Sequence, residues 1–464
     1  MGGPAASARR ERWLGSATQQ ASSLAVGVLP DGEANRSTRR YRGTKVNEVR
    51  RNGRQGFGEA HRTDEAGTPN PGDPAEGEGG RVTDPREGKT AEPPSLETVS
   101  TKLARIAKLA REAPDMSFRT LAHHIDVDFL HEAYRRTRKD GAEGVDGVGA
   151  EDYEKNLGQN LKSLLDRFKS GTYKAPPVRR VHISKGDGRT RPIGIPTFED
   201  KILQRAVAMV LNAVYEQDFL DCSFGFRPGR SAHDALEVLQ KGLMDMGGGW
   251  VLDVDIKGFF DTIEPKHLRD FLDQRVQDGV LRRTINKWLS AGVQEVGCLS
   301  YPDAGTPQGG VISPILANVY LHEVLDKWFR DEVKPRLKGH AFLVRYADDF
   351  VIVCLLEEDA RRILEVLPKR FGKYGLTLHP DKTRLVPFKR PQGPQDANKS
   401  PGTFDLLGFT HHWAMTRQGY QVPKRKTAAS RFARGLKRIA EWCQTNRHLP
   451  VRDQAKTLGQ KLRG

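Results

Sequence analysis

The chain has 464 residues, with 75 lysines and arginines against 59 aspartates and glutamates, so its formal net charge is +16. A basic excess of this size favours a polyanionic partner, because each phosphate bound by lysine or arginine releases counterions. No run of about 18 apolar residues is present, so no membrane span is expected, and no apolar segment resembling a secretory signal follows the N-terminus. The cysteines form no CxxC pair, which argues against a zinc site or disulfide scaffold and favours a cytoplasmic location. They are Cys222, Cys298, Cys354 and Cys443.

Residues 1–95 differ in composition from the rest of the chain. They are rich in glycine, serine, proline, arginine and glutamate, and residues 67–74 read GTPNPGDP, which cannot hold a helix or a central strand. Such a segment cannot bury enough apolar surface to offset the entropy of ordering it. We therefore predict a disordered low-complexity tail over 1–95. A loose RNA contact by its basic first half, a plain tail and a start codon assigned too early are all compatible with this composition.

Helical patterns begin after this tail. Apolar residues recur at helical spacing from Leu103 to Ala110 and again from Phe129 to Tyr134. A third amphipathic pattern starts at Leu157 and is ended by Gly171. We predict a helical N-terminal extension over 96–175.

The next segment, 176–415, mixes short apolar strands with helices. Residues 178–183 alternate in the manner of a strand, the glycines around Asp187 indicate a hairpin turn, and 191–195 would return antiparallel. Residues 200–219 predict a buried helix.

Three aspartates stand at the ends of predicted core strands. Asp255 lies at the end of the strand 250–256, and Asp348 and Asp349 lie between two further apolar strands. Phosphoryl transfer requires in-line positioning and cations, and Mg²⁺ prefers oxygen ligands. Adjacent carboxylates on a turn, facing a third on a neighbouring strand, meet that need. Taken by themselves, two aspartates at this position also fit an ordinary solvated hairpin turn.

Seven blocks of sequence resemble one enzyme family. Tyr346-Ala347-Asp348-Asp349 resembles the YxDD box of reverse transcriptases, residues 255–261 (DIKGFFD) resemble the carboxylate motif before it, and 305–314 (GTPQGGVISP) resemble the PQG box. Further matching blocks lie at 191–196, 224–231, 376–383 and 406–409. Over about residues 95–464, the sequences of these blocks are similar to those of the bacterial group II intron reverse transcriptase/maturase family.

The resemblance implies an α+β fold, the right-hand polymerase. It places fingers and palm, with an antiparallel palm sheet, over 176–415. Residues 416–464, basic and helical after Pro423, resemble the start of the thumb/maturase domain, and the chain is expected to be a truncated member. The remainder of that domain and the nuclease module of some members are expected to be missing, so splicing assistance is in doubt and DNA cleavage is not expected.

The implied activity is RNA-directed DNA synthesis, in which two Mg²⁺ ions, with Mn²⁺ as a substitute, support transfer of a nucleotide from a dNTP to a primer 3′-OH. Implied partners are an RNA template, intron RNA, a DNA primer and dNTPs, with a homodimer also considered and no membrane. Three alternatives remain open: an RNA-binding maturase or remnant without polymerase function, a domesticated reverse transcriptase of retron or defence type, and an RNA-directed RNA polymerase.

The resemblance also assigns roles to individual residues. Catalysis falls to Asp255, Asp348, Asp349 and Lys382, and metal binding to Asp255, Ile256, Asp348 and Asp349. Asp253 is the alternative to Asp255 for this catalytic and metal-binding role.

Phe260 is assigned as the aromatic ring that excludes a ribose 2′-OH, because a ring against C2′ leaves no room for a hydroxyl. Ordinary core packing of Phe260 is the alternative, and Phe259 would take the role if the register shifted by one residue.

Further assignments concern the nucleotide and the nucleic acid. Lys185 and Arg191 flank the predicted hairpin and would contact the triphosphate, while Gln308 would reach the nucleotide sugar. The residues expected to contact the nucleic acid are Arg227, Arg230, Lys424 and Arg425.

Overall fold

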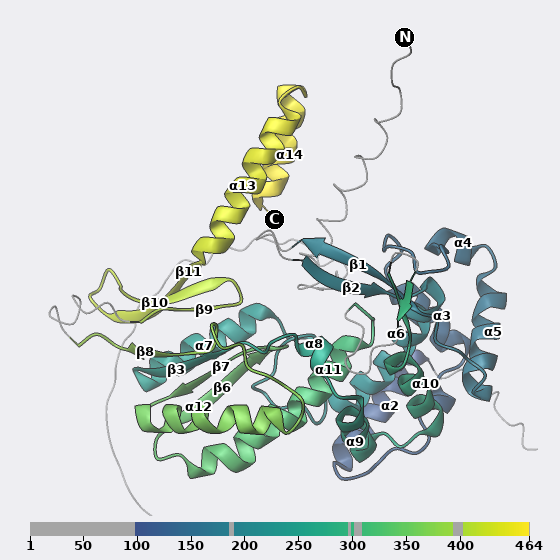
Figure 1. Ribbon diagram of the computed structural model, residues 1–464, viewed down its shortest axis with the longest axis horizontal. Coiled ribbons are helices and arrows are strands. Elements are labelled where there is room, and N and C mark those ends of the chain that lie inside the picture. Colours follow the sequence, from purple (N-terminus) through teal and green to yellow (C-terminus); the bar gives the residue numbers. More distant parts are fainter. Residues whose placement is uncertain (1–97, 185–189, 296–297, 301–308, 393–401, 464) are drawn as a thin grey trace, which may run out of the picture. The chain divides into compact units, whose positions relative to one another are not determined.

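The protein combines helices with three small sheets and is of mixed α+β class, as Figure 1 shows. This part of the predicted fold class is confirmed. The predicted tail over 1–95 lies outside the residues that the structure describes. The computed structural model describes residues 98–184, 190–295, 298–300, 309–392 and 402–463. Within these ranges no helix has both the length and the apolar character that crossing a bilayer requires.

The predicted N-terminal helices are all present. Asp126 begins one of them by accepting a hydrogen bond from the Phe129 amide, and Gly171 ends another in the left-handed conformation, with φ 79°. The first and second predicted helices pack against the helix α6 (Phe198–Tyr215), and the third packs against the second. The elements are α2 (Val99–Glu112), η1 (Ala122–His124), α3 (Val127–Arg136), α4 (Ala150–Glu154) and α5 (Leu157–Ser170).

The predicted hairpin forms one edge of the first sheet. The strand β1 (Val178–Ser184) pairs antiparallel with β2 (Thr190–Ile195), and the turn between them lies outside the described residues. On its other side β1 pairs parallel with β4 (Val293–Glu295), which pairs antiparallel with β5 (Cys298–Ser300). The strand order is β2-β1-β4-β5.

The middle segment contributes further helices, and α6 is buried along most of its length. The expected helix 200–219 is therefore observed, but it ends at Tyr215 and is followed by a turn. A reciprocal capping box between Ser231 and Asp234 starts α7. These helices are α7 (Ala232–Met246), α8 (Phe259–Thr262), α9 (Pro265–Arg275), α10 (Gly279–Leu289) and α11 (Ser313–Leu321). The helix α11 continues into η2 (His322–Asp326), η3 (Phe329–Val333) and η4 (Lys334–Arg336).

The second sheet is antiparallel throughout, as predicted. Its order is β6-β7-β3-β8. Alternation along the strands gives it two apolar faces. Leu252 and Ile352 belong to the large core on the side of α12, whereas Val251, Val351 and Val353 belong to a second core shared with α7 and β9 (Phe404–Leu406). The strands and the covering helix are β3 (Gly248–Val254), β6 (Ala341–Tyr346), β7 (Asp349–Cys354), β8 (Arg384–Lys389) and α12 (Glu357–Gly372).

The third sheet corrects the expectation that the chain becomes helical after Pro423. Residues 424–426 lie in a strand, because β10 and β11 form a hairpin in which Lys426 pairs with Thr410. This sheet spans both sides of the expected boundary between 415 and 416. Its order is β11-β10-β9, with β9 (Phe404–Leu406), β10 (Phe409–Met415) and β11 (Gln421–Thr427).

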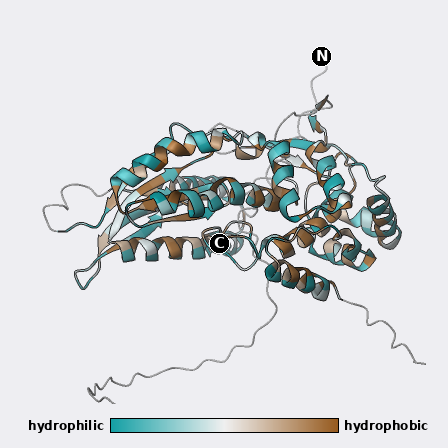
Figure 2. Ribbon diagram, turned by 90° about the horizontal axis from the view of Figure 1, so that it is seen from below, coloured by the Kyte–Doolittle hydropathy of each residue, from teal (hydrophilic) through white to brown (hydrophobic). Residues whose placement is uncertain are grey.

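Two amphipathic helices follow, α13 (Ala429–Asn446) and α14 (Val451–Arg463). They pack against each other, and neither contains a buried residue. Hydrophobic and hydrophilic residues alternate around the helices of the protein, as Figure 2 shows. Large apolar side chains of α13 and α14, including Phe432 and Leu462, remain exposed.

Candidate active site

The pairing of β7 with both β3 and β6 brings the predicted aspartates together. Tyr346 pairs with Asp349, so Ala347 and Asp348 form a two-residue hairpin turn, in which Ala347 adopts the left-handed conformation with φ 58°. On the other side of β7, Val254 pairs with Phe350, which carries Asp255 to the end of β3 beside Asp349. We call residues 346–349 the aspartate turn.

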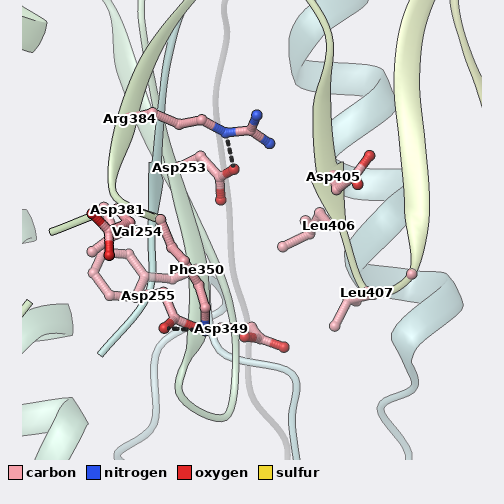
Figure 3. Close-up of a pocket in the computed structure, with 12 residues that line it drawn as sticks. Asp253, Val254, Asp255, Asp349, Phe350, Asp381, Arg384, Asp405, Leu406 and Leu407 are labelled. Atoms are coloured by element: carbon pink, nitrogen blue, oxygen red, sulfur yellow. Dashed lines mark hydrogen bonds and ion pairs between the residues drawn. The ribbon is translucent and has the colours of Figure 1, made fainter. Parts of the chain in front are cut away.

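A cleft of about 400 Å³ opens beside this end of the sheet, as Figure 3 shows. One wall is formed by the ends of β3, β7 and β8, and the other by the β9–β10 turn at Leu406, Leu407 and Gly408. Its lining is strongly acidic, and the carboxylates belong to Asp253, Asp255, Asp349, Asp381 and Asp405.

Two cations pair with the aspartates of β3. Lys382 Nζ donates a hydrogen bond to Asp255 Oδ2 at 2.8 Å, and Arg384 Nε donates one to Asp253 Oδ2 at 3.1 Å. Asp253 and Arg384 also face each other across the β3–β8 register, so this pair is built into the sheet. Asp255 lies beyond the last paired residue and is closer to the aspartate turn, which favours it over Asp253.

The acidic groups shift one another's protonation. Burial raises the pKa of Asp348, and the nearby charge of Asp255 acts in the same direction, whereas Arg191 and Arg345 oppose it. Desolvation at the turn, together with the charges of Asp348 and Asp255, raises the pKa of Asp349 to about 7, although its side chain keeps contact with solvent. Burial and the neighbouring carboxylates thus both disfavour the ionised form of Asp349 in the protein alone.

The donor set fits a divalent cation in its chemistry. All three carboxylates offer hard oxygen ligands, and the ammonium group of Lys382 already rests on an oxygen of Asp255. In their present positions, however, no three His, Cys, Asp or Glu side chains among the described residues form a group that could hold a metal. The Ile256 side chain is buried and apolar, so only its main-chain carbonyl qualifies as a ligand.

The two adjacent phenylalanines differ in accessibility. Phe259 is buried, and its ring packs edge-on against Tyr320. Phe260 is packed against the core but stays partly exposed. Phe260 is therefore the more accessible of the two rings, whereas the ring of Phe259, which the shifted register would use, is already enclosed by protein.

The expected nucleotide-binding residues are only partly described. Arg191 lies on β2, and its charge acts on Asp348. Lys185 and Gln308 lie outside the described residues. The neighbouring Gly309 has φ 114°, and a Cβ there would lie 2.6 Å from the carbonyl oxygen of Gly194, so the chain passes close to β2.

One nucleic-acid assignment is corrected by the structure. The Arg227 side chain is only 3% exposed; it pairs with Glu216 at 3.1 Å and donates to the carbonyl oxygens of Leu220 and Ser223. Its hydrogen-bonding capacity is used inside the protein, so Arg227 is a structural residue. Arg230 stays accessible beside Asp221.

Lys424 and Arg425 are exposed on β11. Their accessibility is compatible with the predicted contact to nucleic acid.

Sequence reasoning missed the residues behind the aspartate turn. Arg345 is completely buried beneath it and pairs with Asp326. Asn318 donates to the carbonyl oxygen of Gly225, whose α-carbon packs against Ala347. The available signal was a single arginine inside the otherwise apolar strand that ends at Tyr346.

Replacing Gly225 with alanine is expected to destabilise the protein. The new Cβ would lie 2.2 Å from the Ala347 nitrogen, and main-chain atoms have no room to move aside without distorting the turn. Overpacking of this kind costs about 1–3 kcal/mol, which should lower the melting temperature by several degrees. The control is Gly372→Ala in α12, where a Cβ meets no atom within 4 Å. Equal melting temperatures for the two variants would contradict the close packing at Gly225.

Asp349→Asn is expected to stabilise the metal-free protein in a pH-dependent way. Because the pKa of Asp349 is raised from 3.8 to about 7, the folded protein binds this proton more tightly than the unfolded chain. Ionisation therefore lowers stability as the pH rises from about 4 to about 7. Melting curves in EDTA should show a larger gain over wild type at pH 8 than at pH 5. An equal gain at both pH values would show that ionisation of Asp349 is not the cause.

Comparison with known proteins agrees with this geometry. Residues 183–411 match the family model described as reverse transcriptase (RNA-dependent DNA polymerase). The chain is 33% identical over 327 residues to protein YkfC of Escherichia coli, a match that covers 62% of this chain and 84% of YkfC. It is 38% identical over 229 residues to the group II intron-encoded protein LtrA of Lactococcus lactis, covering 49% of this chain and 38% of LtrA.

A weaker match, 28% identical over 222 residues, is to the nuclear intron maturase 2 of Arabidopsis thaliana, covering 37% of this chain and 30% of that protein. The matches to these two intron-related proteins thus span well under half of their length. The protein has an acidic site at the end of an antiparallel sheet, a matching family model and a relative that is aligned over most of its length. The chain therefore belongs to the reverse transcriptase family and carries an RNA-dependent DNA polymerase domain.

Proposed function

We propose that this protein is a reverse transcriptase of group II intron type, which extends a primer 3′-OH with dNTPs on an RNA template. The observation that carries the proposal is the meeting of Asp255 with Asp348 and Asp349 at one end of the β6-β7-β3-β8 sheet. In this interpretation that sheet is the palm, the β1–β2 hairpin belongs to the fingers, and α13 and α14 begin the thumb.

The aspartates are the proposed holders of two Mg²⁺ ions, or Mn²⁺ as a substitute, with the Ile256 carbonyl as a further ligand. When bound, such ions activate the attacking hydroxyl and neutralise charge on the phosphoryl group. The raised pKa of Asp349 supports this role, since crowded carboxylates favour a cation over solvent alone.

Cations around the site have separate proposed roles. Lys382, 2.8 Å from Asp255, can neutralise or protonate the pyrophosphate leaving group. Arg191, whose charge acts on Asp348 from β2, would contact the triphosphate, with Lys185 and Gln308 completing the nucleotide site. These side chains orient a polyanionic substrate over the aspartates.

An intron RNA is the proposed natural template and partner. The relatives LtrA and nuclear intron maturase 2 are an intron-encoded protein and an intron maturase by name. The net charge of +16 and the exposed basic residues of β11, Lys424 and Arg425, supply favourable contacts for RNA phosphates.

Primer extension tests the proposal directly. Purified protein with an annealed RNA template and DNA primer should extend the primer with dNTPs in Mg²⁺, and Asp348→Ala should abolish extension because a carboxylate of the proposed metal site is removed. Asp381→Ala removes an exposed aspartate of the same cleft and should keep most of the activity. Extension that survives in Asp348→Ala would refute the site assignment.

The same assay separates the alternative functions. A wild-type protein that binds structured intron RNA tightly but never extends a primer would favour an RNA-binding maturase or remnant. Extension that depends on an RNA structurally unrelated to introns would favour a domesticated reverse transcriptase.

Phe260→Ala tests the choice between DNA and RNA synthesis. Removing the partly exposed ring should admit a 2′-OH, so the ratio of kcat/KM for dATP to that for ATP should fall by about 10-fold or more. Phe432→Ala, which removes an exposed ring on α13, should leave this ratio unchanged. A ratio that stays at the wild-type value in Phe260→Ala would assign this ring to core packing.

A further inference from the structure

Arg345 is the largest completely buried side chain of the described residues, and every donor on its guanidinium group is used. Nε and Nη2 donate to the two carboxylate oxygens of Asp326 at 2.8 and 2.5 Å. Nη2 also donates to Ser223 Oγ at 2.7 Å, and Nη1 donates to Asn318 Oδ1 and to the carbonyl oxygen of Ala347, both at 3.0 Å. These five hydrogen bonds match the five N–H groups of arginine.

The bond to Ala347 reaches the aspartate turn itself. Ala347 has φ 58°, a conformation that a residue with a Cβ rarely adopts and that its surroundings must enforce. Its carbonyl group belongs to the peptide that links Ala347 to Asp348. A donor fixed on this oxygen therefore sets the orientation of the main chain from which the Asp348 side chain projects.

The main chain of Arg345 holds the opposite side of the same region. Its amide donates to the Cys222 carbonyl at 2.8 Å, and its carbonyl accepts from the Phe224 amide at 2.9 Å. Asn318 Nδ2 donates to the Gly225 carbonyl at 2.8 Å, and Gly225 packs against Ala347. Two segments distant in sequence, the chain around residue 223 and the continuous helix that carries Asn318 and Asp326, thus meet behind the turn through one arginine.

Stability alone is a weak reason for such a pair. Desolvating two charges is costly, and apolar residues of similar volume often stabilise a core equally well. What apolar residues cannot supply is a directional donor to one particular carbonyl oxygen.

We propose that Arg345, oriented by Asp326, Ser223 and Asn318, is a positioning residue that fixes the Ala347–Asp348 peptide and so aims the Asp348 carboxylate at the reacting groups. This inference rests on the proposed function, which assigns Asp348 its role. Arg345 itself does not contact substrate; it acts through the main chain of the turn.

A second buried arginine provides a matched control. Arg275 pairs with both carboxylate oxygens of Asp218 at 2.8 and 3.1 Å and donates to three main-chain carbonyl oxygens at the end of α2. It has the same chemistry as Arg345, but its carbonyl partners are Ala110, Ala113 and Met116, none of which belongs to the aspartate turn.

The experiment compares Arg345→Lys, Asn318→Ala and Arg275→Lys with wild type. Lysine keeps the charge but cannot reproduce the five hydrogen bonds that the planar guanidinium group donates. The measurements are the melting temperature, kcat and KM for dNTP in primer extension, and Mn²⁺ affinity of the protein without nucleic acid by electron paramagnetic resonance. Arg345→Lys should lower kcat by about 100-fold with little change in KM, since misplacement on the order of 1 Å has this effect. Its Mn²⁺ affinity should fall by about 10-fold.

The controls separate positioning from general stability. Arg275→Lys should lower the melting temperature by a similar amount while keeping wild-type kcat and Mn²⁺ affinity. Asn318→Ala, which removes one acceptor of Nη1, should lower kcat and Mn²⁺ affinity in the same way as Arg345→Lys but by a smaller factor. If Arg345→Lys does not fold, the Asn318→Ala result tests the positioning role.

Two results would overturn the inference: wild-type kcat and Mn²⁺ affinity in the folded Arg345 or Asn318 variant, or equal losses of both in Arg275→Lys. A wild-type protein that fails to extend primers would refute the proposed function instead, and the Mn²⁺ measurement would still decide the role of Arg345.

Discussion

Like charges at one end of a sheet must be compensated by nearby cations, and several elements of this structure supply them. The antiparallel pairing of β7 with β3 and β6 places Asp255 beside the turn that carries Asp348 and Asp349. Lys382 compensates Asp255 directly, Arg384 compensates Asp253, and Arg191 and Arg345 act on Asp348 from two sides. Burial, together with the charges of Asp348 and Asp255, raises the pKa of Asp349, and such an electrostatic environment favours a bound cation.

The surrounding fold holds these groups in place by packing both faces of the sheet. The α12 side joins the large core, while the other side joins α7 and the β9 strand. Because side chains alternate along a strand, Asp253 and Asp255 lie on the same face as Val251, the face that opens into the cleft. The same alternation that builds the second core thus directs the carboxylates toward the β9–β10 turn. Behind the turn, the close approach of Gly225 and the hydrogen bond from Arg345 leave the main chain little freedom.

Interpretation of the sequence succeeded where the signal was local. Alternating or continuous apolar residues predicted β1, β2, β3, β6 and β7, and helical spacing predicted α2, α3, α5 and α6, because each pattern reflects which faces of one element are buried. It was wrong about residues 424–426, where pairing with β10 outweighed the helical appearance of a basic segment. The assignment of Arg227 to nucleic-acid contact was also wrong, because the sequence does not show whether an arginine binds phosphate or donates to carbonyl oxygens inside the protein.

By itself, the sequence determined the antiparallel sheet, the aspartates at its strand ends and the family they indicate, since these depend on short-range periodicity and on contiguous motifs. Only the tertiary structure decided which groups surround those aspartates. Arg345 meets Ser223, Asn318 and Asp326 across separations of 122, 27 and 19 residues, and Lys382 meets Asp255 across 127. Contacts over such distances follow from how the elements pack. The family resemblance assigned Lys382 to the site, but no local pattern in the sequence indicated its pairing with Asp255 or the partners of Arg345.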